Sequence, residues 1–381
     1  MFIVEREQLQ SLFDALIRRG YALIGPTVRD SAIAYDEIKS VDDLPVGWTD
    51  EQDAGRYRLN RRSDQAMFAY AVGPHSWKRY LHPPSIRFWQ AKRNGRGFNI
   101  HEEERKNSPF AFIGVRPCDL RAIEILDTVF TGREFVDASY ESRRRDAFIV
   151  AVNCIYPAST CFCSSMLTGP RATGGFDLCL TEILEPDHHQ FTVEVGSQRG
   201  EEILQDIPRR TATEEDAETF RLLMAEAEAR IRRRVHTKDM KEFLYKNYEH
   251  PQWQEIANRC LSCANCTMVC PTCFCTAVED TTDLMGNEAE RSRRWDSCFT
   301  MDFSYIHGGG IRSSTRARYR QWMTHKLASW VDQFGTPGCT GCGRCITWCP
   351  AGIDLTEEFR TMQESENNKL ICEEVKTNGN T

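Results

Sequence analysis

Two cysteine runs with identical spacing constrain this chain more than any other feature of its sequence. The spacing is C-x2-C-x2-C-x3-C-P, and it occurs at residues 260–271 and again at 339–350. Three cysteines two residues apart can wrap a tight loop around one cubane of iron and sulfide, and thiolate is a soft, strongly donating ligand for iron. In runs of this kind the fourth cysteine ligates the other cluster. The repeated run therefore predicts two [4Fe-4S] clusters that exchange one ligand each.

The exchange of the fourth cysteine defines the two predicted ligand sets. The first cluster is expected to bind Cys260, Cys263, Cys266 and Cys349, and the second to bind Cys339, Cys342, Cys345 and Cys270. Two structural zinc sites are the alternative, because closely spaced cysteine pairs also serve zinc. Zinc sites would not favour two copies of a run that ends in Cys-Pro, so the iron–sulfur interpretation is preferred. Disulfide bonds are a less favoured interpretation than zinc.

The other cysteines are also clustered, and the composition of the chain indicates how to interpret them. The chain has 381 residues and 17 cysteines, none of them in residues 1–117. Its N-terminus lacks the basic start and apolar stretch of a secretory signal, and no apolar run approaches the length of a membrane span. We therefore expect a cytoplasmic protein, and in that reducing setting clustered cysteines indicate metal sites more than disulfides. The net charge of −7 argues against a general nucleic-acid binder.

Apolar periodicity and turn residues predict an α+β chain made of successive domains. The expected parts are a mixed α/β domain at 1–205, a helical linker at 206–250, a helical bacterial-ferredoxin-like domain at 251–362 and a polar, frayed tail at 363–381. The ferredoxin-like domain contains a long insert, 276–338, for which we expect a helical segment. In the first domain we expect a helix at 9–17 and strands near 32–38, 65–72, 110–115, 147–152, 176–184 and 190–195. Thr211 and Glu214 have capping-box spacing for the linker helix.

Four cysteines of the first domain form a third candidate cage. Cys118 follows the strand at 110–115, where Asp119 can cap a helix whose N-terminus favours a thiolate or an anionic cluster. Cys154 ends the strand at 147–152, and Cys161 and Cys163 follow in a loop. Two strand ends and one loop that converge would make a four-cysteine [4Fe-4S] site. The spacing matches no general ferredoxin rule, so buried or redox-inert cysteines remain the alternative.

The remaining motifs carry less weight. Cys273, Cys275 and Cys298 are expected to be buried thiols, or groups beside the ligands, more than ligands themselves. Cys179 is expected to be a small packed residue. The insert is rich in arginine, with RSRRW at 291–295 and IRSSTRARYRQW at 311–322. Nucleic acid is one interpretation of these arginines, but a segment that balances cluster charge or docks a partner explains them better.

Several motifs in a specific order carry a family resemblance. They are GVRPCDL at 114–120, CFCSSM at 161–166, RCLSCANCTMVCPTCFC at 259–275, WDSCF at 295–299 and CTGCGRC at 339–345. The chain resembles the beta subunit of soluble sulfhydrogenases, which are multi-subunit cytoplasmic [NiFe] hydrogenases linked to NAD(P). It is similar, less closely, to the A subunit of anaerobic sulfite reductase. The resemblance runs from the N-terminal helix to about residue 360.

The resemblance implies an electron-transfer subunit with several [4Fe-4S] clusters, and it strengthens the prediction of the third. Its implied partners are a flavin subunit that handles NAD(P)H and the small and large subunits of the hydrogenase. Flavin, NAD(P) and nickel are expected in those chains, and this chain is expected to have no catalytic site and no nucleic-acid or membrane partner. The alternatives are the equivalent subunit of an anaerobic sulfite or sulfur reductase, an independent enzyme that reduces sulfur or sulfite, and an iron–sulfur sensor.

Overall fold

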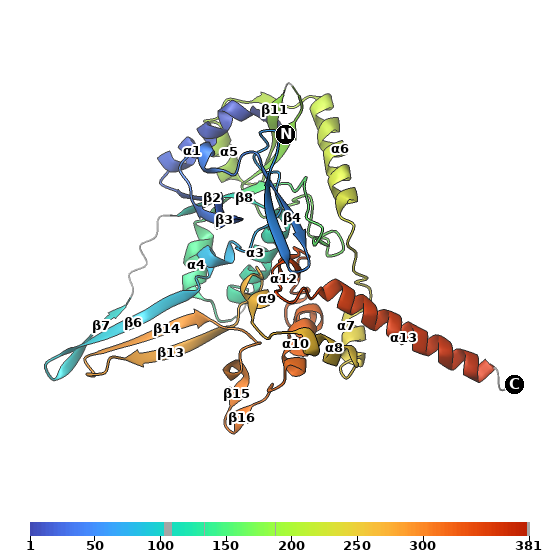
Figure 1. The fold of residues 1–381 in the computed structure, drawn as a ribbon. Coiled ribbons are helices and arrows are strands. Elements are labelled where there is room, and N and C mark those ends of the chain that lie inside the picture. Colours follow the sequence, from blue (N-terminus) through green and yellow to red (C-terminus); the bar gives the residue numbers. More distant parts are fainter. Residues whose placement is uncertain (103–108, 133, 187, 379–381) are drawn as a thin grey trace.

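A mixed eight-stranded sheet forms the first part of the molecule. The structure is a computed structural model that describes residues 1–102, 109–132, 134–186 and 188–378 (Figure 1). The strand order is β12 (Arg210–Thr211), β1 (Phe2–Glu5), β11 (His189–Val195), β10 (Leu178–Leu184), β9 (Phe148–Val152), β8 (Phe110–Val115), β2 (Ala22–Arg29) and β3 (Ala32–Glu37). The strands β10, β9, β8 and β2 run parallel, and the outer pairs are antiparallel.

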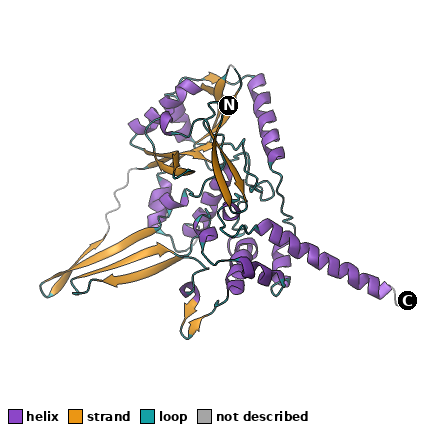
Figure 2. Ribbon diagram, viewed as in Figure 1, coloured by secondary structure: helices purple, strands orange, loops and turns teal. Residues whose placement is uncertain are grey.

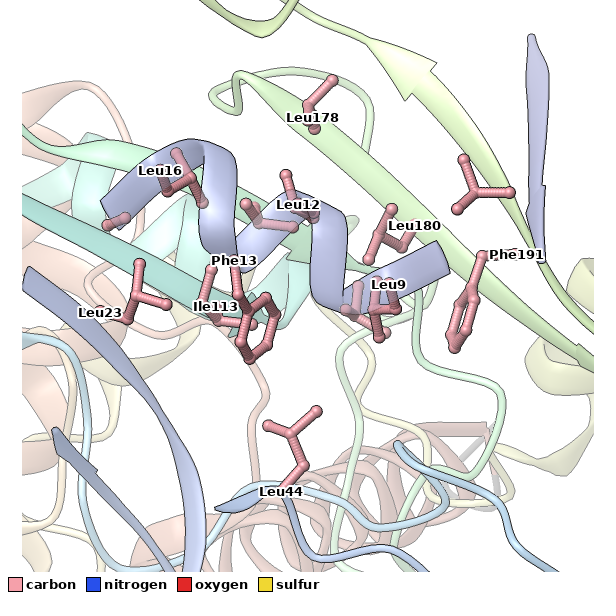
Figure 3. Packing of buried hydrophobic residues seen from close by; sticks show 14 of the residues in the cluster. Leu9, Leu12, Phe13, Leu16, Leu23, Leu44, Ile113, Leu178, Leu180 and Phe191 are labelled. Carbon is pink, nitrogen blue, oxygen red and sulfur yellow. The ribbon is translucent and has the colours of Figure 1, made fainter. Parts of the chain in front are cut away.

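Helices cover both faces of this sheet. On one face lie α1 (Leu9–Arg18) and α5 (Gln198–Leu204), and Figure 3 shows Leu12 and Phe13 of α1 directed at the sheet. On the other face lie α2 (Lys78–Leu81), α3 (Pro117–Phe130) and α4 (Ala138–Arg145). Because side chains alternate along a strand, the central strands are apolar on both faces. Each buried Leu or Phe contributes about 1.5–3 kcal/mol.

Most of the expected strands are present, but the one near 65–72 is absent. Residues 66–72 are buried without joining a sheet, and Gln65 is exposed. The backbone N–H groups of Met67 and Phe68 instead donate to the Glu182 carboxylate, at 2.6 and 2.8 Å. A buried side chain therefore satisfies backbone donors that a neighbouring strand would otherwise satisfy. Two-stranded pairing occurs just before this segment, between β4 (Trp48–Asp53) and β5 (Arg56–Arg61).

The linker begins with a strand and continues as a helix. The expected cap at Thr211 is wrong, because Thr211 belongs to β12 and pairs with β1. The helix α6 (Glu214–Arg230) is capped two residues later, by a reciprocal capping box between Thr213 and Asp216. The sheet of the first domain therefore extends past residue 205.

A helical core surrounds the two cysteine runs. It consists of α7 (Met240–Lys246), α8 (Gln252–Arg259), α9 (Asn265–Met268), α10 (Thr315–Thr324), a π-helical turn (His325–Ser329), α11 (Trp330–Phe334), α12 (Arg344–Thr347) and α13 (Leu355–Asn378). Trp253, Ile256 and Ile346 are fully buried in this core. The tail was expected to be frayed, but α13 continues through the polar residues after 363 as a long helix. This helix projects from the body (Figure 1). None of the helices in the described residues is long and apolar enough to cross a membrane.

The insert is the largest departure from expectation, because its first half is β-structure. The strands β13 (Thr276–Thr282) and β14 (Glu288–Trp295) join β6 (Ser85–Asn94) and β7 (Gly97–Glu102) in a four-stranded sheet, ordered β13-β14-β6-β7. Figure 2 shows this sheet projecting from the body as an arm. A small hairpin of β15 (Tyr305–Ile306) and β16 (Gly309–Gly310) follows, and short 3-10 turns lie at Arg6–Gln8, Val41–Asp43 and Asp302–Ser304. One sheet thus contains strands from both sides of the expected domain boundary.

Candidate iron–sulfur centres

The first cysteine run encloses a cavity beside α10 and the start of α13. The loop turns tightly because Ser262 and Ala264 adopt left-handed backbone angles, with φ of +52° and +65°. The cavity is lined by Cys260, Cys263, Cys266, Cys345 and Cys349 together with apolar residues such as Phe299, Trp322 and Ile353. Cys349 thus faces the run at 260–266, although it lies far away in the sequence. Backbone N–H groups donate to two of these sulfurs, from Ser262 to Cys260 at 3.4 Å and from Ile353 to Cys349 at 3.3 Å.

The second run has the same form. Gly341 and Gly343 adopt left-handed backbone angles in the loop, with φ of +65° and +77°. The Gly341 N–H donates to the Cys339 sulfur at 3.4 Å. Burial raises the pKa of the Cys339 thiol to about 12 and also raises the pKa of Cys342 and Cys345. Charge on Cys270 adds to the rise in all three, so Cys270 lies beside this set and not only beside its own sequence neighbours.

The four cysteines of the first domain also converge. Cys118 lies in the first turn of α3 after β8, Cys154 follows β9, and Cys161 and Cys163 lie in the next loop. Burial raises the pKa of the Cys161 thiol well above its ordinary value, and the nearby Cys163 and Cys154 raise it further. Burial dominates at Cys118 as well, where Cys163 is again among the groups that raise the pKa. The helix terminus, the strand end and the loop therefore form one buried group of thiols.

The expectation that Asp119 caps α3 is wrong. The Asp119 carboxylate instead binds the Arg344 guanidinium through two hydrogen bonds of 2.7 and 2.8 Å, with both side chains buried. Asp119 follows Cys118, and Arg344 lies between Cys342 and Cys345, so this ion pair joins the third cage to the second run. The N-cap position of α3 is held by Arg116 without a side-chain cap. Sequence reasoning missed Arg344, which carries no motif signal beyond its place inside the cysteine run.

Buried cations lie beside the thiols without carboxylate partners. In the described residues no Asp or Glu oxygen is within 4.0 Å of the side-chain nitrogens of Arg116, Lys78 or Lys326. Arg116 donates to three backbone carbonyls, and its charge lowers the pKa of Cys154 against the stronger effect of burial, which raises it. A buried cation is costly unless an anion compensates it. A [4Fe-4S] core with four thiolates carries a net charge of roughly −2, so the donor set and the charges fit such clusters.

The remaining cysteines have distinct surroundings. Cys273 interacts with the Cys270 thiol, and Cys275 interacts with the Cys298 thiol. Cys179 is fully buried in β10. The cysteines that the structure describes are all free of disulfides. Among those same residues, no three His, Cys, Asp or Glu side chains are grouped to hold a single metal ion.

The arginines of the insert pair mainly with carboxylates. Arg291 binds Asp280, Arg293 binds Asp137, and Arg320 binds Glu249. The expectation that the insert balances cluster charge or docks a partner stays a prediction. Arg116, Arg344, Lys78 and Lys326 are buried cations that interact with the thiols from outside these ion pairs.

Comparisons with known proteins agree with this arrangement. Residues 259–353 match the family described as a 4Fe-4S dicluster domain. Sulfhydrogenase 2 subunit beta of Pyrococcus furiosus is 32% identical over 348 residues, which cover 89% of this chain and 92% of that protein. This chain belongs to the sulfhydrogenase beta-subunit family. No solved structure matches it.

Membership of the sulfhydrogenase beta-subunit family gives the cysteine runs their chemical meaning. The dicluster domain contains both runs, so [4Fe-4S] clusters are the cofactors of this part of the chain. The family and the clusters together support a role in electron transfer. A cluster bound here would supply one-electron oxidation and reduction, while the protein supplies burial, hydrogen bonds to sulfur and nearby charge.

Proposed function

We propose that this chain is the electron-transfer subunit of a multi-subunit [NiFe] hydrogenase. It carries single electrons between a flavin subunit that handles NAD(P)H and the small subunit of the hydrogenase. Three [4Fe-4S] clusters are its cofactors, with the ligand sets Cys260, Cys263, Cys266 and Cys349, then Cys339, Cys342, Cys345 and Cys270, then Cys118, Cys154, Cys161 and Cys163.

The observation that carries the proposal is the continuous arrangement of the three cysteine groups. Cys118 and Cys163 of the third cage pack in one buried cluster with Cys342 of the second run. Cys345 of the second run lines the cavity of the first and lies within electrostatic range of Cys266. The second group therefore lies between the other two, and electrons would cross the chain in the order third, second, first, or the reverse.

The exposed end of this path lies at the first cysteine run. Cys263 is exposed, whereas Cys118, Cys161 and Cys163 are buried. Leu261 next to it is 68% exposed, which makes this edge suited to contact with another protein. The loops and helix termini of this chain hold the thiols, exclude water from most of them and provide N–H donors to sulfur, which stabilises the more negative reduced state.

Anaerobic purification of the intact complex tests the proposal. The expected result is that the chain co-purifies with a flavin-containing polypeptide and a nickel-containing polypeptide, and that the complex reduces NAD(P) with hydrogen. Recovery with a siroheme protein would instead support the equivalent subunit of a sulfite reductase. Recovery as a single polypeptide that reduces polysulfide or sulfite unaided would overturn the electron-transfer role in favour of an independent enzyme.

A further inference from the structure

The sulfur of Cys270 has more hydrogen-bond partners than any other candidate ligand in the described residues. The Lys326 ammonium donates to it at 3.2 Å, and the Thr272 hydroxyl lies 3.2 Å away. The sulfurs of Cys260, Cys339 and Cys349 each accept a hydrogen bond from a backbone N–H group. Cys270 therefore has an unusually positive environment.

Lys326 is held firmly in this position. Lys326 lies in the π-helical turn and is 6% exposed. The ammonium also donates to the Thr272 hydroxyl and to the Gly338 carbonyl, each at 2.9 Å. With Cys270 as the third acceptor, all three N–H bonds of the ammonium are used. The lysine cannot leave this position without losing buried hydrogen bonds, so its charge stays directed at the Cys270 sulfur.

Lys78 places a second buried ammonium beside the same group. It comes from α2, far from Lys326 in the sequence, and is 3% exposed. Its ammonium donates to the Cys273 carbonyl at 2.9 Å and lies 4.0 Å from the centre of the Trp295 ring. The two lysines are close enough to repel each other, and the other groups that act strongly on both are cysteines. Two buried like charges without a carboxylate between them require an anion nearby.

We propose that Lys326 and Lys78 are the counter-charges of the second cluster and raise its reduction potential through the Cys270 sulfur. This inference rests on the proposed function, because it assumes that Cys270 ligates that cluster. Reduction adds one negative charge to the cluster, so a fixed positive charge and hydrogen bonds to sulfur favour the reduced form. Both lysines act as positioning and tuning residues and touch no substrate.

Redox titration of the anaerobically reconstituted full chain, followed by EPR, tests this inference. The variants are Lys326→Met and Lys78→Met, which keep an unbranched side chain but remove the charge. Lys241→Met is the matched control, because Lys241 is partly exposed and pairs with Asp332. We expect the midpoint of the second cluster to shift to lower potential, more for Lys326→Met than for Lys78→Met. The other clusters and the control should remain as in the parent chain.

Iron and sulfide content separates failure of this inference from failure of the proposed function. A full complement of iron with an unchanged midpoint in both lysine variants would overturn the inference and leave the electron-transfer role intact. If Lys326→Met does not retain the second cluster, Lys78→Met decides, with a lower midpoint supporting the inference and an unchanged one overturning it. A parent chain that binds no iron after reconstitution would contradict the proposed function itself.

Discussion

At the scale of single residues, the decisive feature is which cysteines meet. Cys349 faces the cavity of the first run, and Cys270 lies beside the second run, so a thiol of each run lies beside the other run. Burial raises the pKa of the Cys266 and Cys345 thiols well above the ordinary value, so binding to iron must supply the free energy that keeps them deprotonated.

Exchange of the fourth ligand predicts which cluster a single substitution affects. Cys349→Ala should remove or alter the cluster bound by Cys260, Cys263 and Cys266, with a loss of up to about four irons per chain. Cys270→Ala is the matched variant and should affect the other cluster of the pair. EPR spectra of the reduced proteins, with iron analysis, distinguish the two. Loss of the signal of the Cys339–Cys345 cluster in Cys349→Ala would contradict the exchange.

At the scale of elements, two cluster loops lie in direct backbone contact. The loop at 160–163 of the third cage meets the loop at 339–345, where the Phe162 N–H donates to the Gly341 carbonyl at 2.9 Å. A Cβ atom on Gly341 would lie 2.7 Å from the backbone of Cys163. This glycine therefore permits both a left-handed turn and a close approach between two candidate ligand loops.

The close approach predicts a large effect for Gly341→Ala. The left-handed backbone costs about 1–2 kcal/mol for alanine, and the contact with Cys163 adds about 1–3 kcal/mol. Gly335→Ala is the control, because Gly335 has φ of +72° but no described atom lies within 4 Å of its added Cβ. Denaturant unfolding of the apo-proteins should show the greater loss for Gly341→Ala. An equal loss of unfolding free energy in the two variants would show that the loops at 160–163 and 339–345 can move apart at no cost.

The buried ion pair between α3 and α12 predicts a second effect at this scale. Asp119→Asn removes one partner of Arg344 and should lower the free energy of unfolding by about 3–5 kcal/mol, since an uncompensated buried charge remains. Asp280→Asn, which disrupts the exposed pair with Arg291, should cost far less, because water screens an exposed ion pair. Urea unfolding compares the two variants, and a similar small loss in both would refute a stabilising role for the buried pair.

At the scale of the whole molecule, the expected domains are interlocked. The sheet of β13, β14, β6 and β7 contains strands from both halves of the chain, and the pair of Asp119 and Arg344 connects the halves again. The cysteines add to this coupling, because Cys118, Cys163 and Cys342 belong to one buried group of side chains. Within the described residues, the α/β part and the cysteine runs are therefore joined by a shared sheet and a buried ion pair.

This coupling predicts that iron removal weakens both halves together. Anaerobic chelation should lower the free energy of unfolding, since the thiols and the buried cations lose their compensation. Hydrogen exchange followed by mass spectrometry should then show faster exchange in β8 and α8 alike, compared with protein incubated without chelator. Unchanged protection in β8 together with full exchange in α8 would indicate two independent domains.

Local sequence patterns predicted the strands at 110–115 and 147–152. They failed where a side chain distant in the sequence forms the hydrogen bond that a local partner was expected to form. The strands at 110–115 and 147–152 follow from short apolar runs, and β8 and β9 match them within one residue. The segment at 65–72 has the same apolar character, but Glu182 takes its backbone donors. Asp119 has the residue type of a cap, but a buried arginine more than two hundred residues away binds its carboxylate.

The spacing of the cysteines by itself determined the chemistry of this protein. A thiolate binds iron wherever the loop places it, and the repeat of one run predicts two clusters from the sequence of each loop alone. Only the tertiary structure decided how the cysteine groups are arranged and which buried cations lie near them. The insert pairs with β6 by backbone hydrogen bonds that no side-chain pattern encodes, and Arg116, Lys78 and Lys326 reach the thiols from elements distant in sequence. Long-range burial, which local sequence does not encode, therefore brought together cysteines that are distant in the sequence.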